Sequence, residues 1–577
     1  MDSDESSETN LVIVTRRDRY KLFCRTYWRT LVILIAPIIL LPVTLFSDKS
    51  AYKCFYVFLL MVVYWTLDVL HPAVLAVMPI GFSCIMTGMG ANFIEKIYIR
   101  NDLLDCVGVM MITIAVENSN VHKRLALKVL LMFGCSHFRL SFLLFFSSMF
   151  LSMWISNILA CGLMMPVVLA ILTELEKLGI VEIYQTIGKA KQSSVRHEQT
   201  FPRPTDFTVF YFLGIAYSSS IGNMATMMGS ETNQIFKIYC ETIFPVGPKI
   251  EFPHFMLLNL PGVLVMETLL YLWMNFSFLG MFRSRSTIGI GMTEEEAQYI
   301  DALLATQYQQ LGKMRFHEFA VSTVVVLAGL LQATISTVRI DQSTNGRSEF
   351  HNHFSVSSPS VLSVILLFLI PINLDFIKYF KRRSEGTSDP LPATPTKSCL
   401  NWNLVRRNIH WSIPLIIAGS STLFESLKDS KMTEEFEQFL MNFEGWHASV
   451  VVFIVVLFCK TITECATNSC VVYALLPSIA KVSVFCNINP HYLMMAATLS
   501  SSLPFHLMTG TPINAMVCTY VHIPPWRMMY AGIGPSIIAI VVVWFTVVVW
   551  SPAIWTDITL DPDWADVNIF KIFRHRV

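Results

Sequence analysis

Long apolar segments alternate with short polar ones along most of the chain. Residues 28–46 form the first apolar segment long enough to cross a bilayer, at about 20 residues per crossing. The apolar segments that follow are 52–70, 73–89, 255–279, 319–335, 360–372, 411–427, 448–459 and 528–550. Segment 103–116 is too short for a comfortable crossing, and we expect it to be partly buried or re-entrant. This pattern predicts an all-α polytopic membrane protein.

Polar intervals divide the apolar pattern into two halves. The expected divisions are a polar tail at 1–27, a first half at 28–280, a connection at 281–315, a second half at 316–551 and a C-terminal tail at 552–577. Basic residues are concentrated between Arg16 and Arg25, just before the first apolar segment. Because positive charge beside a first span favours the cytoplasmic side, we expect the N-terminal tail and the connection in the cytoplasm. We expect no cleavable signal peptide, because the chain begins with an acidic, polar stretch.

The composition agrees with a membrane protein and argues against other classes. Hydrophobic residues make up 54% of the chain and charged residues 14%, with a mean hydropathy of +0.54. A soluble protein would carry roughly a quarter charged residues. The net charge of +1 gives no electrostatic reason to expect nucleic-acid binding. The 13 cysteines are scattered without metal-binding spacing, so we interpret them as small hydrophobic residues.

A polar cluster lies inside the apolar run 151–166. Ser152, Ser156 and Asn157 occur there within two turns of a helix. Hydrocarbon strongly penalises unpaired polar groups, so the cluster must either pack against other helices or line a cavity. We expect it to line a small-anion site, because the second half of the chain repeats it.

The repeat consists of matched polar breaks in the two halves. Its members are Ser156-Asn157 and Thr467-Asn468, the prolines Pro166 and Pro477, and the Gly-x-x-x-Asn breaks from Gly229 to Asn233 and from Gly510 to Asn514. An inserted polar loop at 174–204 explains the longer interval in the first half. Small polar residues also occur at packed membrane-helix interfaces. Four clusters in matched order nevertheless favour a binding site, because matched breaks indicate the central site of a transporter.

The residue types in these breaks indicate how such a site would work. Inverted repeats place matched breaks near the middle of the bilayer, where half-helix N-termini offer free N–H groups and a positive dipole end to an anion. Oxygen atoms of the same loops could hold a cation. No Lys or Arg lies in any of the four breaks. An anion there must therefore be bound by dipoles, hydroxyls, amides and bound cations.

Other motifs give no support to an enzyme. His317-Glu318 lacks the second histidine of a zinc-protease helix, because Val321 stands in its place. The chain contains no phosphate-binding loop, so we do not expect ATP to drive it.

Several single residues are further candidates. Asp68, Glu117 and Glu464 are ionisable and lie in or near apolar segments, where such residues are functional candidates by default. A helix-cap or loop-edge role is the alternative for Asp68 and Glu117. We expect His506 to be a packed side chain.

At the four breaks the chain resembles the divalent-anion sodium symporters, which include the sodium-coupled di- and tricarboxylate carriers of animals and the INDY-type carriers of insects. The family's hallmark is a Ser-Asn-Thr tripeptide in each half, and the segments 153–158 and 463–469 stand at these places. The breaks at 216–222 and 510–514 are similar to the family's unwound loops. Glu464 matches the family's Thr-Glu pair beside the second site. The resemblance extends from about Tyr20 to Trp550.

The resemblance implies a fold, an assembly and a set of site residues. It implies a homodimer whose subunit has about 11 transmembrane helices plus two re-entrant hairpins, arranged as an inverted repeat with scaffold and transport domains that work as an elevator. The implied sodium ligands are Ser152, Ser156, Asn157, Gly222, Gly229, Thr463, Ala466, Asn468 and Gly510. The implied substrate contacts are Ser156, Asn157, Thr467, Asn468, Ser469, Thr511 and Pro512. No catalytic residue is implied, and no cofactor besides sodium ions.

The chain departs from the family pattern at several positions. Ile158 replaces the threonine of the first tripeptide, and losing a hydrogen bond to a substrate costs about 1–3 kcal/mol. The second tripeptide reads Thr-Asn-Ser, which keeps both hydroxyls. Asn223 and Met224 interrupt a stretch that is usually Gly-Gly-Thr. Glu231 adds a carboxylate that either replaces a cation, carries a proton or is a hydrated acid at the loop rim.

These observations leave several functions open. The first is a secondary carrier of di- or tricarboxylates, of the succinate and citrate class, in the plasma membrane and coupled to a cation. A carrier of sulfate or another anion, a sodium-independent exchanger, and a membrane scaffold that does not transport are the alternatives. An intramembrane enzyme ranks last, because no acid–base constellation is visible. The expected partners are a small anion, sodium, membrane lipid and a second copy of the chain, without nucleic acid.

Overall fold

The computed structural model describes residues 16–45, 49–87, 101–185, 202–279, 294–344, 357–379, 395–555, 558–559, 562 and 564–565. Within these residues the fold is helical, and the only extended pairings are two isolated bridges. Eight of the described helices are long and apolar enough to cross a membrane, or nine if the bent pair Asp102–Ser119 and Val121–Phe133 is one span. The prediction of an all-α polytopic membrane protein is confirmed, while the number of crossings stays a prediction.

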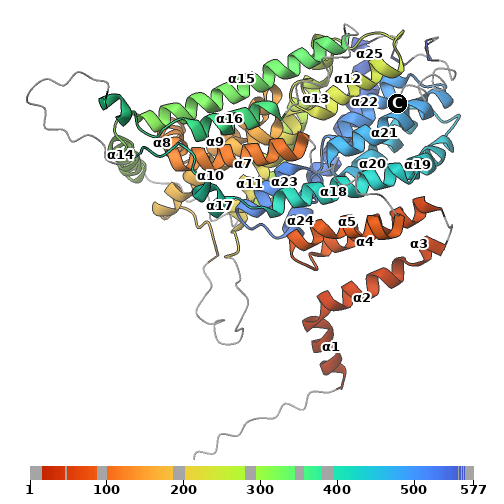
Figure 1. Cartoon of the computed structure of the whole chain (residues 1–577), viewed down its shortest axis with the longest axis horizontal. Coiled ribbons are helices and arrows are strands. Elements are labelled where there is room, and N and C mark those ends of the chain that lie inside the picture. Colours follow the sequence, from red (N-terminus) through yellow and green to blue (C-terminus); the bar gives the residue numbers. More distant parts are fainter. Residues whose placement is uncertain are drawn as a thin grey trace, which may run out of the picture.

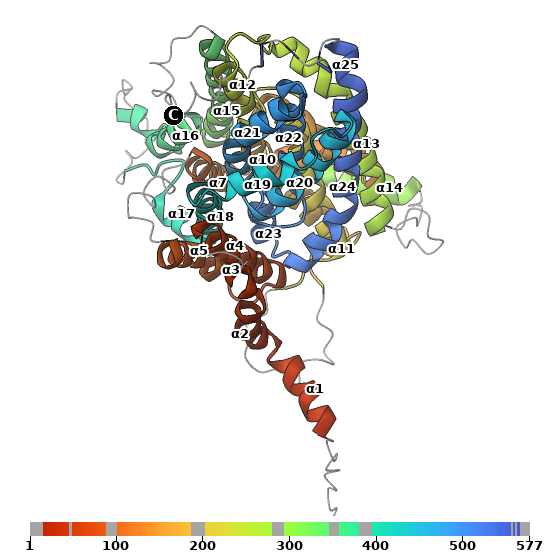
Figure 2. The ribbon, with the colours of Figure 1, turned by 90° about the vertical axis from the view of Figure 1, so that its right-hand side faces the viewer.

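The N-terminal helices form the periphery of the molecule. They are α1 (Arg16–Thr26), α2 (Trp28–Leu40), α3 (Pro42–Leu45), α4 (Ser50–Leu67) and α5 (Pro72–Thr87). α1 and α2 project from the body of the protein in both views (Figures 1 and 2). Only 6% of the segment Trp28–Leu45 is buried, and Leu34, Ile38 and Ile39 are exposed. α2 therefore needs lipid or another chain around it.

The first half continues with seven helices. They are α7 (Asn101–Ser119), α8 (Val121–Phe133), α9 (His137–Trp154), α10 (Asn157–Lys177), α11 (Asp206–Gly222), α12 (Glu231–Ile243) and α13 (Phe252–Leu279). α7 is longer than the predicted segment 103–116, and it meets α8 at an angle of 70°. Asn120 makes this bend possible by adopting the left-handed conformation, at φ 63°.

The rest of the chain is also helical where the structure describes it, beginning with the described part of the predicted connection. Its helices are α14 (Glu294–Gln310), α15 (Phe316–Thr344), α16 (Ser358–Leu369), η4 (Asp375–Tyr379), α17 (Trp402–Asn408), α18 (Ser412–Asp429), α19 (Met432–Met441), α20 (Ala448–Cys465), α21 (Asn468–Phe485), α22 (Pro490–Ser501), α23 (Pro512–Tyr520), α24 (Pro525–Phe545), the π-helical turn η5 (Thr546–Trp550) and α25 (Ser551–Ile554). The predicted segment 448–459 is too short, because α20 continues to Cys465.

Glu318 forms a buried ion pair that joins two helices. The Arg124 guanidinium of α8 donates to the Glu318 carboxylate of α15 at 2.7 Å. The same guanidinium donates to the carbonyls of Leu311 and Gly312 at 2.9 and 2.8 Å. These hydrogen bonds join α8 to the start of α15, with both side chains largely buried.

The same series of helices occurs in both halves of the chain. Each half has two helices joined by a short break, α9–α10 and α20–α21, which we call the first and second hairpins. Each hairpin is followed by two helices joined by a longer irregular loop, α11–α12 and α22–α23. We call these loops, at 223–230 and 502–511, the first and second breaks. Both were predicted near these positions from the polar residues that they contain.

The core lies around the second arm of each hairpin and the helix before each break. Protein buries 83% of the apolar segment of α10 and 72% of that of α21. All of α22 is buried, as is α11 from Thr208 to Gly222. The halves also exchange helices, since α23 packs against α10 and α11 while α12 packs against α21 and α22. The Tyr217 hydroxyl of the first half donates to the Phe505 carbonyl of the second at 2.8 Å.

Candidate functional site

A small cavity lies where the two hairpins and the two breaks meet. Its volume is about 40 Å³, which is enough for a few water molecules. Its walls come from both halves of the chain, together with α7 and α15. The polar clusters that the sequence separates are therefore brought to one place.

Four helices begin at this cavity. Its lining includes Asn157 of α10, Glu231 of α12, Asn468 of α21 and Pro512 of α23, each the first residue of its helix. A helix N-terminus carries unsatisfied N–H groups and roughly half a positive charge. None of the lining residues that the structure describes is Lys, Arg or His. The cavity can therefore attract an anion through backbone dipoles instead of cationic side chains.

Most of the predicted substrate contacts line the cavity. The predicted residues found there are Ser156, Asn157, Gly229, Asn468, Ser469, Thr511 and Pro512. Ile158, the departure from the family tripeptide, also lines it and presents an apolar side chain. The predicted residues that do not line the cavity are Ser152, Gly222, Thr463, Ala466, Thr467 and Gly510.

Thr467 is the predicted substrate contact that does not line the cavity. Its hydroxyl lies 3.1 Å from the hydroxyl of Ser421 on α18 and donates to the Cys470 sulfur at 2.9 Å. Ser156, its counterpart in the first half, keeps its hydroxyl at the cavity and also accepts from the Leu159 N–H at 3.4 Å. The two hairpin tips therefore offer different hydroxyl groups to a ligand.

Gly229 and Asn233 fix the first break against the first hairpin. A Cβ on Gly229 would lie 2.6 Å from the Ser152 carbonyl oxygen, so the hairpin backbone approaches as closely as glycine allows. The Asn233 amide donates to the carbonyls of Asn223 at 3.0 Å and Thr226 at 2.8 Å. The loop is thereby held open, with the carbonyl oxygens of Ser152 and Asn223 on one side of Gly229.

The second break repeats this arrangement with matched residues. A Cβ on Gly510 would lie 2.9 Å from the Thr463 carbonyl oxygen and 2.5 Å from the Pro504 side chain. The Asn514 amide donates to the carbonyls of Pro504 at 3.1 Å and Leu507 at 3.2 Å. The two acceptor carbonyls have the same spacing along the sequence in both breaks. The matched glycines and asparagines therefore have the same structural role in each half.

Both breaks contain buried oxygen atoms that suit a sodium ion. The Oδ1 atoms of Asn233 and Asn514 are buried and accept no hydrogen bond from any residue that the structure describes. The Asn223 amide is fully buried, and neither its oxygen nor its nitrogen has a partner in the described part of the chain. Buried polar groups are rarely left unpaired, and hard cations prefer oxygen ligands. These residues therefore fit the ions that the sequence predicts at the breaks.

The other predicted sodium ligands do not line the cavity; they are Ser152, Gly222, Thr463 and Ala466. The hydroxyls of Ser152 and Thr463 donate to the carbonyls of Ser219 and Cys459 and retain lone pairs that can face an ion. Ala466 is fully buried between α20 and α21. Gly222 has a packing role.

Gly222 allows α11 to pack closely on α9. A Cβ on this residue would lie 2.2 Å from the Met149 carbonyl oxygen. This contact lies at the end of α11, just before the first break. Gly222 therefore sets the position of the break without facing the cavity.

Sequence reasoning missed the wall of the cavity that comes from α7 and α15. Asp102 and Asp105 of α7 and Gln332 and Ser336 of α15 all line it. Gln332 also accepts a hydrogen bond from the Ser156 N–H at 3.3 Å. Asp105 and Gln332 are polar residues within apolar segments, so the criterion that selected Glu464 could have found them.

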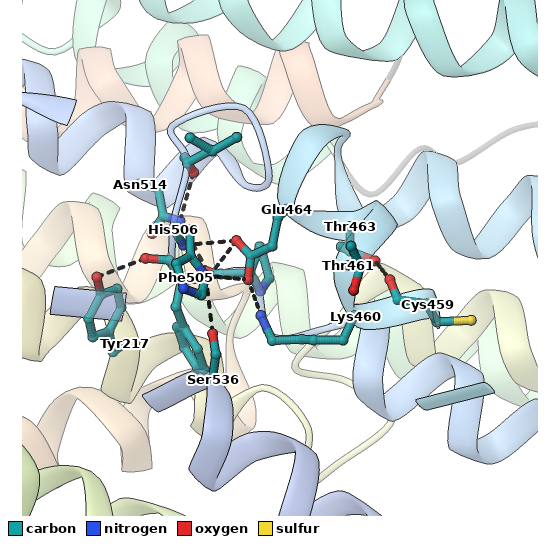
Figure 3. Close-up of polar contacts among 12 residues, drawn as sticks. Tyr217, Cys459, Lys460, Thr461, Thr463, Glu464, Phe505, His506, Asn514 and Ser536 are labelled. Atoms are coloured by element: carbon teal, nitrogen blue, oxygen red, sulfur yellow. Dashed lines mark hydrogen bonds and ion pairs between the residues drawn. The ribbon is translucent and has the colours of Figure 1, made fainter. Parts of the chain in front are cut away.

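Figure 3 shows Glu464 in contact with Phe505 and His506 of the second break. Glu464 anchors this break and does not line the small cavity. Its carboxylate accepts from the backbone N–H groups of Phe505 at 3.0 Å and His506 at 2.8 Å. It also pairs with the Lys460 ammonium, while the His506 ring lies 3.1 Å away. His506 is therefore more than a packed side chain, since its ring also lies 3.2 Å from the Ser536 hydroxyl. This network positions the loop that carries Gly510.

The other two ionisable candidates lie away from the breaks. Asp68 ends α4 in the left-handed conformation, at φ 48°, which agrees with the helix-cap role. Glu117 accepts a hydrogen bond from the Tyr520 hydroxyl and lines a second cavity.

The second cavity is much larger and lies along the C-terminal half of α10. Its volume is about 570 Å³. Lys123, Lys177 and Arg407 line it together with Glu117 and Glu174. It therefore combines cationic side chains with room for solvent, in contrast to the small cavity at the start of the same helix.

The chain matches known proteins over almost its whole length. Residues 24–556 match the family described as the sodium:sulfate symporter transmembrane region. The chain is 31% identical over 555 residues to "Protein I'm not dead yet" of Drosophila melanogaster, covering 94% of this chain and 92% of that protein. It is 26% identical over 572 residues to the Na(+)/citrate cotransporter of Rattus norvegicus, covering 94% and 98%. It is 25% identical over 585 residues to the Na(+)/dicarboxylate cotransporter 3 of Homo sapiens, covering 93% and 94%.

Proposed function

The chain belongs to the sodium:sulfate symporter family, the divalent-anion sodium symporters, and from this premise we propose that it carries di- or tricarboxylates across the plasma membrane together with sodium. The resemblance found in the sequence is thereby confirmed. The chain is a multi-pass membrane transporter and not an enzyme. Its substrate class, coupling ion and mechanism are the content of the proposal.

The convergence of four helix N-termini on one cavity carries this proposal. The N-termini of α10, α12, α21 and α23 supply positive dipole ends and N–H groups from both halves. The amides of Asn157 and Asn468 and the hydroxyls of Ser469 and Thr511 add neutral hydrogen-bonding groups. An extended molecule with a carboxylate at each end suits a site with one hairpin tip on each side. Two relatives named for citrate and dicarboxylate cotransport support this substrate class.

Sodium coupling follows from the two breaks. Each break holds buried oxygen atoms around a glycine, next to a hairpin tip that contacts the anion. A cation bound there lowers the free energy of a nearby anion, so occupancy of one site favours occupancy of the other. The first ion would be held by Ser152, Ser156, Asn157 and the first break, and the second by Thr463, Asn468 and the second break.

Transport requires the site to open and to move. The small cavity has room for a few water molecules, so a dicarboxylate enters only when the surrounding helices separate. The exchange of α12 and α23 joins both hairpins and both breaks into one unit. We take this unit as the moving transport domain of an elevator, with the other helices as the scaffold of a homodimer. The larger cavity along α10 contains Lys123 and Arg407 besides the ion pair of Lys177 with Glu174, so its side chains can interact with an anion on its way to the site.

Uptake of radiolabelled succinate, citrate and sulfate in sodium and in choline medium tests the proposal. We expect sodium-dependent uptake of at least one carboxylate, and its loss in the Asn157→Ala and Asn468→Ala variants. Asn275→Ala is the matched control, because Asn275 is a buried asparagine of α13 outside the cavity. Absence of uptake by wild-type protein shown to reach the surface would overturn the carrier function. Unchanged uptake in both site variants would overturn the assignment of Asn157 and Asn468 to the substrate site.

Sulfate is the second candidate substrate. Ile158 removes one hydroxyl from the first tip, and the cavity of about 40 Å³ suits a compact anion better than an extended one. Uptake of sulfate without uptake of either carboxylate, in the same experiment, would select this alternative.

A further inference from the structure

Two carboxylates of α7 face the hairpin tips. Asp105 is 3% exposed, and its carboxylate accepts from the Ser156 hydroxyl at 3.1 Å and from the Ser360 hydroxyl of α16. The Ser469 hydroxyl on the second tip lies 3.5 Å from the Asp102 carboxylate. One turn of α7 therefore directs a carboxylate to each tip.

These carboxylates stand where a bound anion would lie. Ser156 and Ser469 are the tip hydroxyls that we expect to donate to a substrate carboxylate. A substrate that approaches either tip must displace the side chain of Asp105 or Asp102 or lie beside its charge. Glu231 adds a third carboxylate, and the described lining contains no Lys, Arg or His. The cavity therefore combines helix dipoles that attract anions with fixed charges that repel them.

Two buried donor groups in the cavity wall, the Gln332 Nε2 and the Thr511 hydroxyl, lack a partner among the described residues. Gln332 is 2% exposed, and its Nε2 has no acceptor within the described residues. Thr511 is also 2% exposed, and its hydroxyl makes no hydrogen bond to any part of the chain that the structure describes. Buried donors of this kind are rare unless a ligand or water completes them. Both can donate to an anion that lies between the tips.

We propose that Asp105, assisted by Asp102, determines specificity by limiting the negative charge of the transported anion. This inference rests on the proposed function and names its substrate class. The positive charge offered by the four helix N-termini is fixed, and a buried site screens repulsion poorly. Each additional substrate charge therefore weakens binding more in the presence of Asp105 than in its absence. The site takes dianionic dicarboxylates in preference to trianionic tricarboxylates.

Uptake of succinate and citrate by wild type, Asp105→Asn and Ser360→Ala at one neutral pH tests the inference. Asparagine keeps the size of Asp105 and can still bond to both serine hydroxyls, so the variant retains its packing. We expect the citrate-to-succinate ratio of kcat/KM to rise at least tenfold in Asp105→Asn, which corresponds to about 1.4 kcal/mol. A smaller rise is expected in Asp102→Asn. Ser360→Ala removes a hydrogen bond but keeps the charge, and should leave the ratio unchanged.

The possible outcomes separate this inference from the proposed function. An unchanged ratio in Asp105→Asn, or an equal rise in Ser360→Ala, overturns the role of charge while uptake of succinate upholds the carrier. If Asp105→Asn reaches the surface but takes up neither anion, the thermal stabilisation of purified variant and wild type by each anion supplies the same ratio. Failure of the proposed function has a different signature, because wild type then takes up neither anion.

Discussion

Hydroxyl groups hold the first break in place, whereas a buried ion pair holds the second. In the first half, the Ser152 hydroxyl donates to the Ser219 carbonyl, and the Thr226 hydroxyl donates to the Met153 carbonyl. In the second half, Glu464 binds two backbone N–H groups of the break and pairs with a lysine. The backbone result is nevertheless the same, with one glycine against a hairpin carbonyl and one asparagine across two loop carbonyls.

The alignment of the two halves shows where the chemistry diverged. With Asn157 placed opposite Asn468, Lys460 and Glu464 stand opposite Met149 and Met153. The charged pair therefore belongs to one half only. The glycine and the asparagine occur in both halves, whereas the groups that hold the loop in place differ. Both halves therefore require the open loop itself, and not one particular way of holding it. The support can be built from neutral or from charged groups, and the charged version is more vulnerable to a single substitution.

The largest effect is expected from breaking the ion pair. Glu464→Ala leaves Lys460 buried without its partner, which costs about 3–5 kcal/mol, and thermal unfolding in detergent should show a large drop in the midpoint. The partly exposed pair Lys481–Glu437 is the matched control, and Glu437→Ala should cost no more than about 1 kcal/mol. Replacing both Lys460 and Glu464 by methionine, as in the first half, removes the unpaired charge and should recover part of the loss, but not the part due to the Phe505 and His506 N–H groups that lose their acceptor. Equal midpoints for Glu464→Ala and wild type would contradict this account.

Adding a methyl group to either glycine should have the next largest effect. Gly229→Ala and Gly510→Ala place a Cβ within 2.6 and 2.5 Å of neighbouring atoms, and such overpacking costs about 1–3 kcal/mol. Because the clash displaces the loop, sodium-dependent uptake should be abolished in both variants at normal surface abundance. Gly81→Ala is the control, since nothing lies within 4 Å of its added Cβ. Full activity in one of the two variants would show that the breaks are not equivalent.

Removing either bridging asparagine should weaken sodium binding. Asn233→Ala and Asn514→Ala each release two loop carbonyls and delete a buried oxygen atom. The sodium concentration for half-maximal uptake should rise roughly tenfold, which corresponds to about 1.4 kcal/mol. Asn259→Ala is the matched control, because Asn259 is a buried asparagine of α13 that donates to the Phe255 carbonyl of its own helix and whose Oδ1, like those of Asn233 and Asn514, has no partner among the described residues. An unchanged sodium dependence in both variants would contradict sodium binding at the breaks.

The smallest effect is expected where the two tips differ in one side chain. Ile158→Thr gives the first tip a hydroxyl at the position that Ser469 occupies in the second. A hydrogen bond of about 0.5–1.5 kcal/mol should lower the KM for the transported anion roughly two- to tenfold. Ile158→Val, which changes the shape without adding a donor, should leave KM nearly unchanged. A rise in KM for Ile158→Thr would show that the apolar contact is the useful one.

The location of the site could be predicted from sequence because polar groups are costly in hydrocarbon. Ser156-Asn157, Thr467-Asn468 and the two Gly-x-x-x-Asn breaks stand out in apolar surroundings, and all four now lie at or beside one cavity. The family could be predicted from the same residues. The wall from α7 and α15 is different: Asp105 and Gln332 stand out as polar residues in apolar segments, but they reach the site through the packing of these helices, which no local pattern specifies.

Helix ends were the least predictable part of the fold. The polar residues after 459 suggested an early end to α20, yet the helix continues to Cys465. The hydroxyls of Thr461 and Thr463 bond to carbonyls of the preceding turn, at 2.8 and 2.7 Å. Such threonines satisfy their own hydroxyls within a helix and do not interrupt it. Hydroxyl residues are therefore weaker signals of a break than Asn or Gly.

The exchange of helices between the halves has a consequence for biogenesis. α10 and α11 are synthesised long before α23, their packing partner in the finished protein. Until then the fully buried Tyr217 hydroxyl lacks the Phe505 carbonyl to which it donates, because that residue belongs to the second half. The nascent first half therefore stays at the translocon or in the bilayer with part of its core unpacked until the second half has been synthesised. We expect a chain that stops before Pro512 to leave that surface of α10 and α11 uncovered, and exposed surface of this kind promotes misassembly.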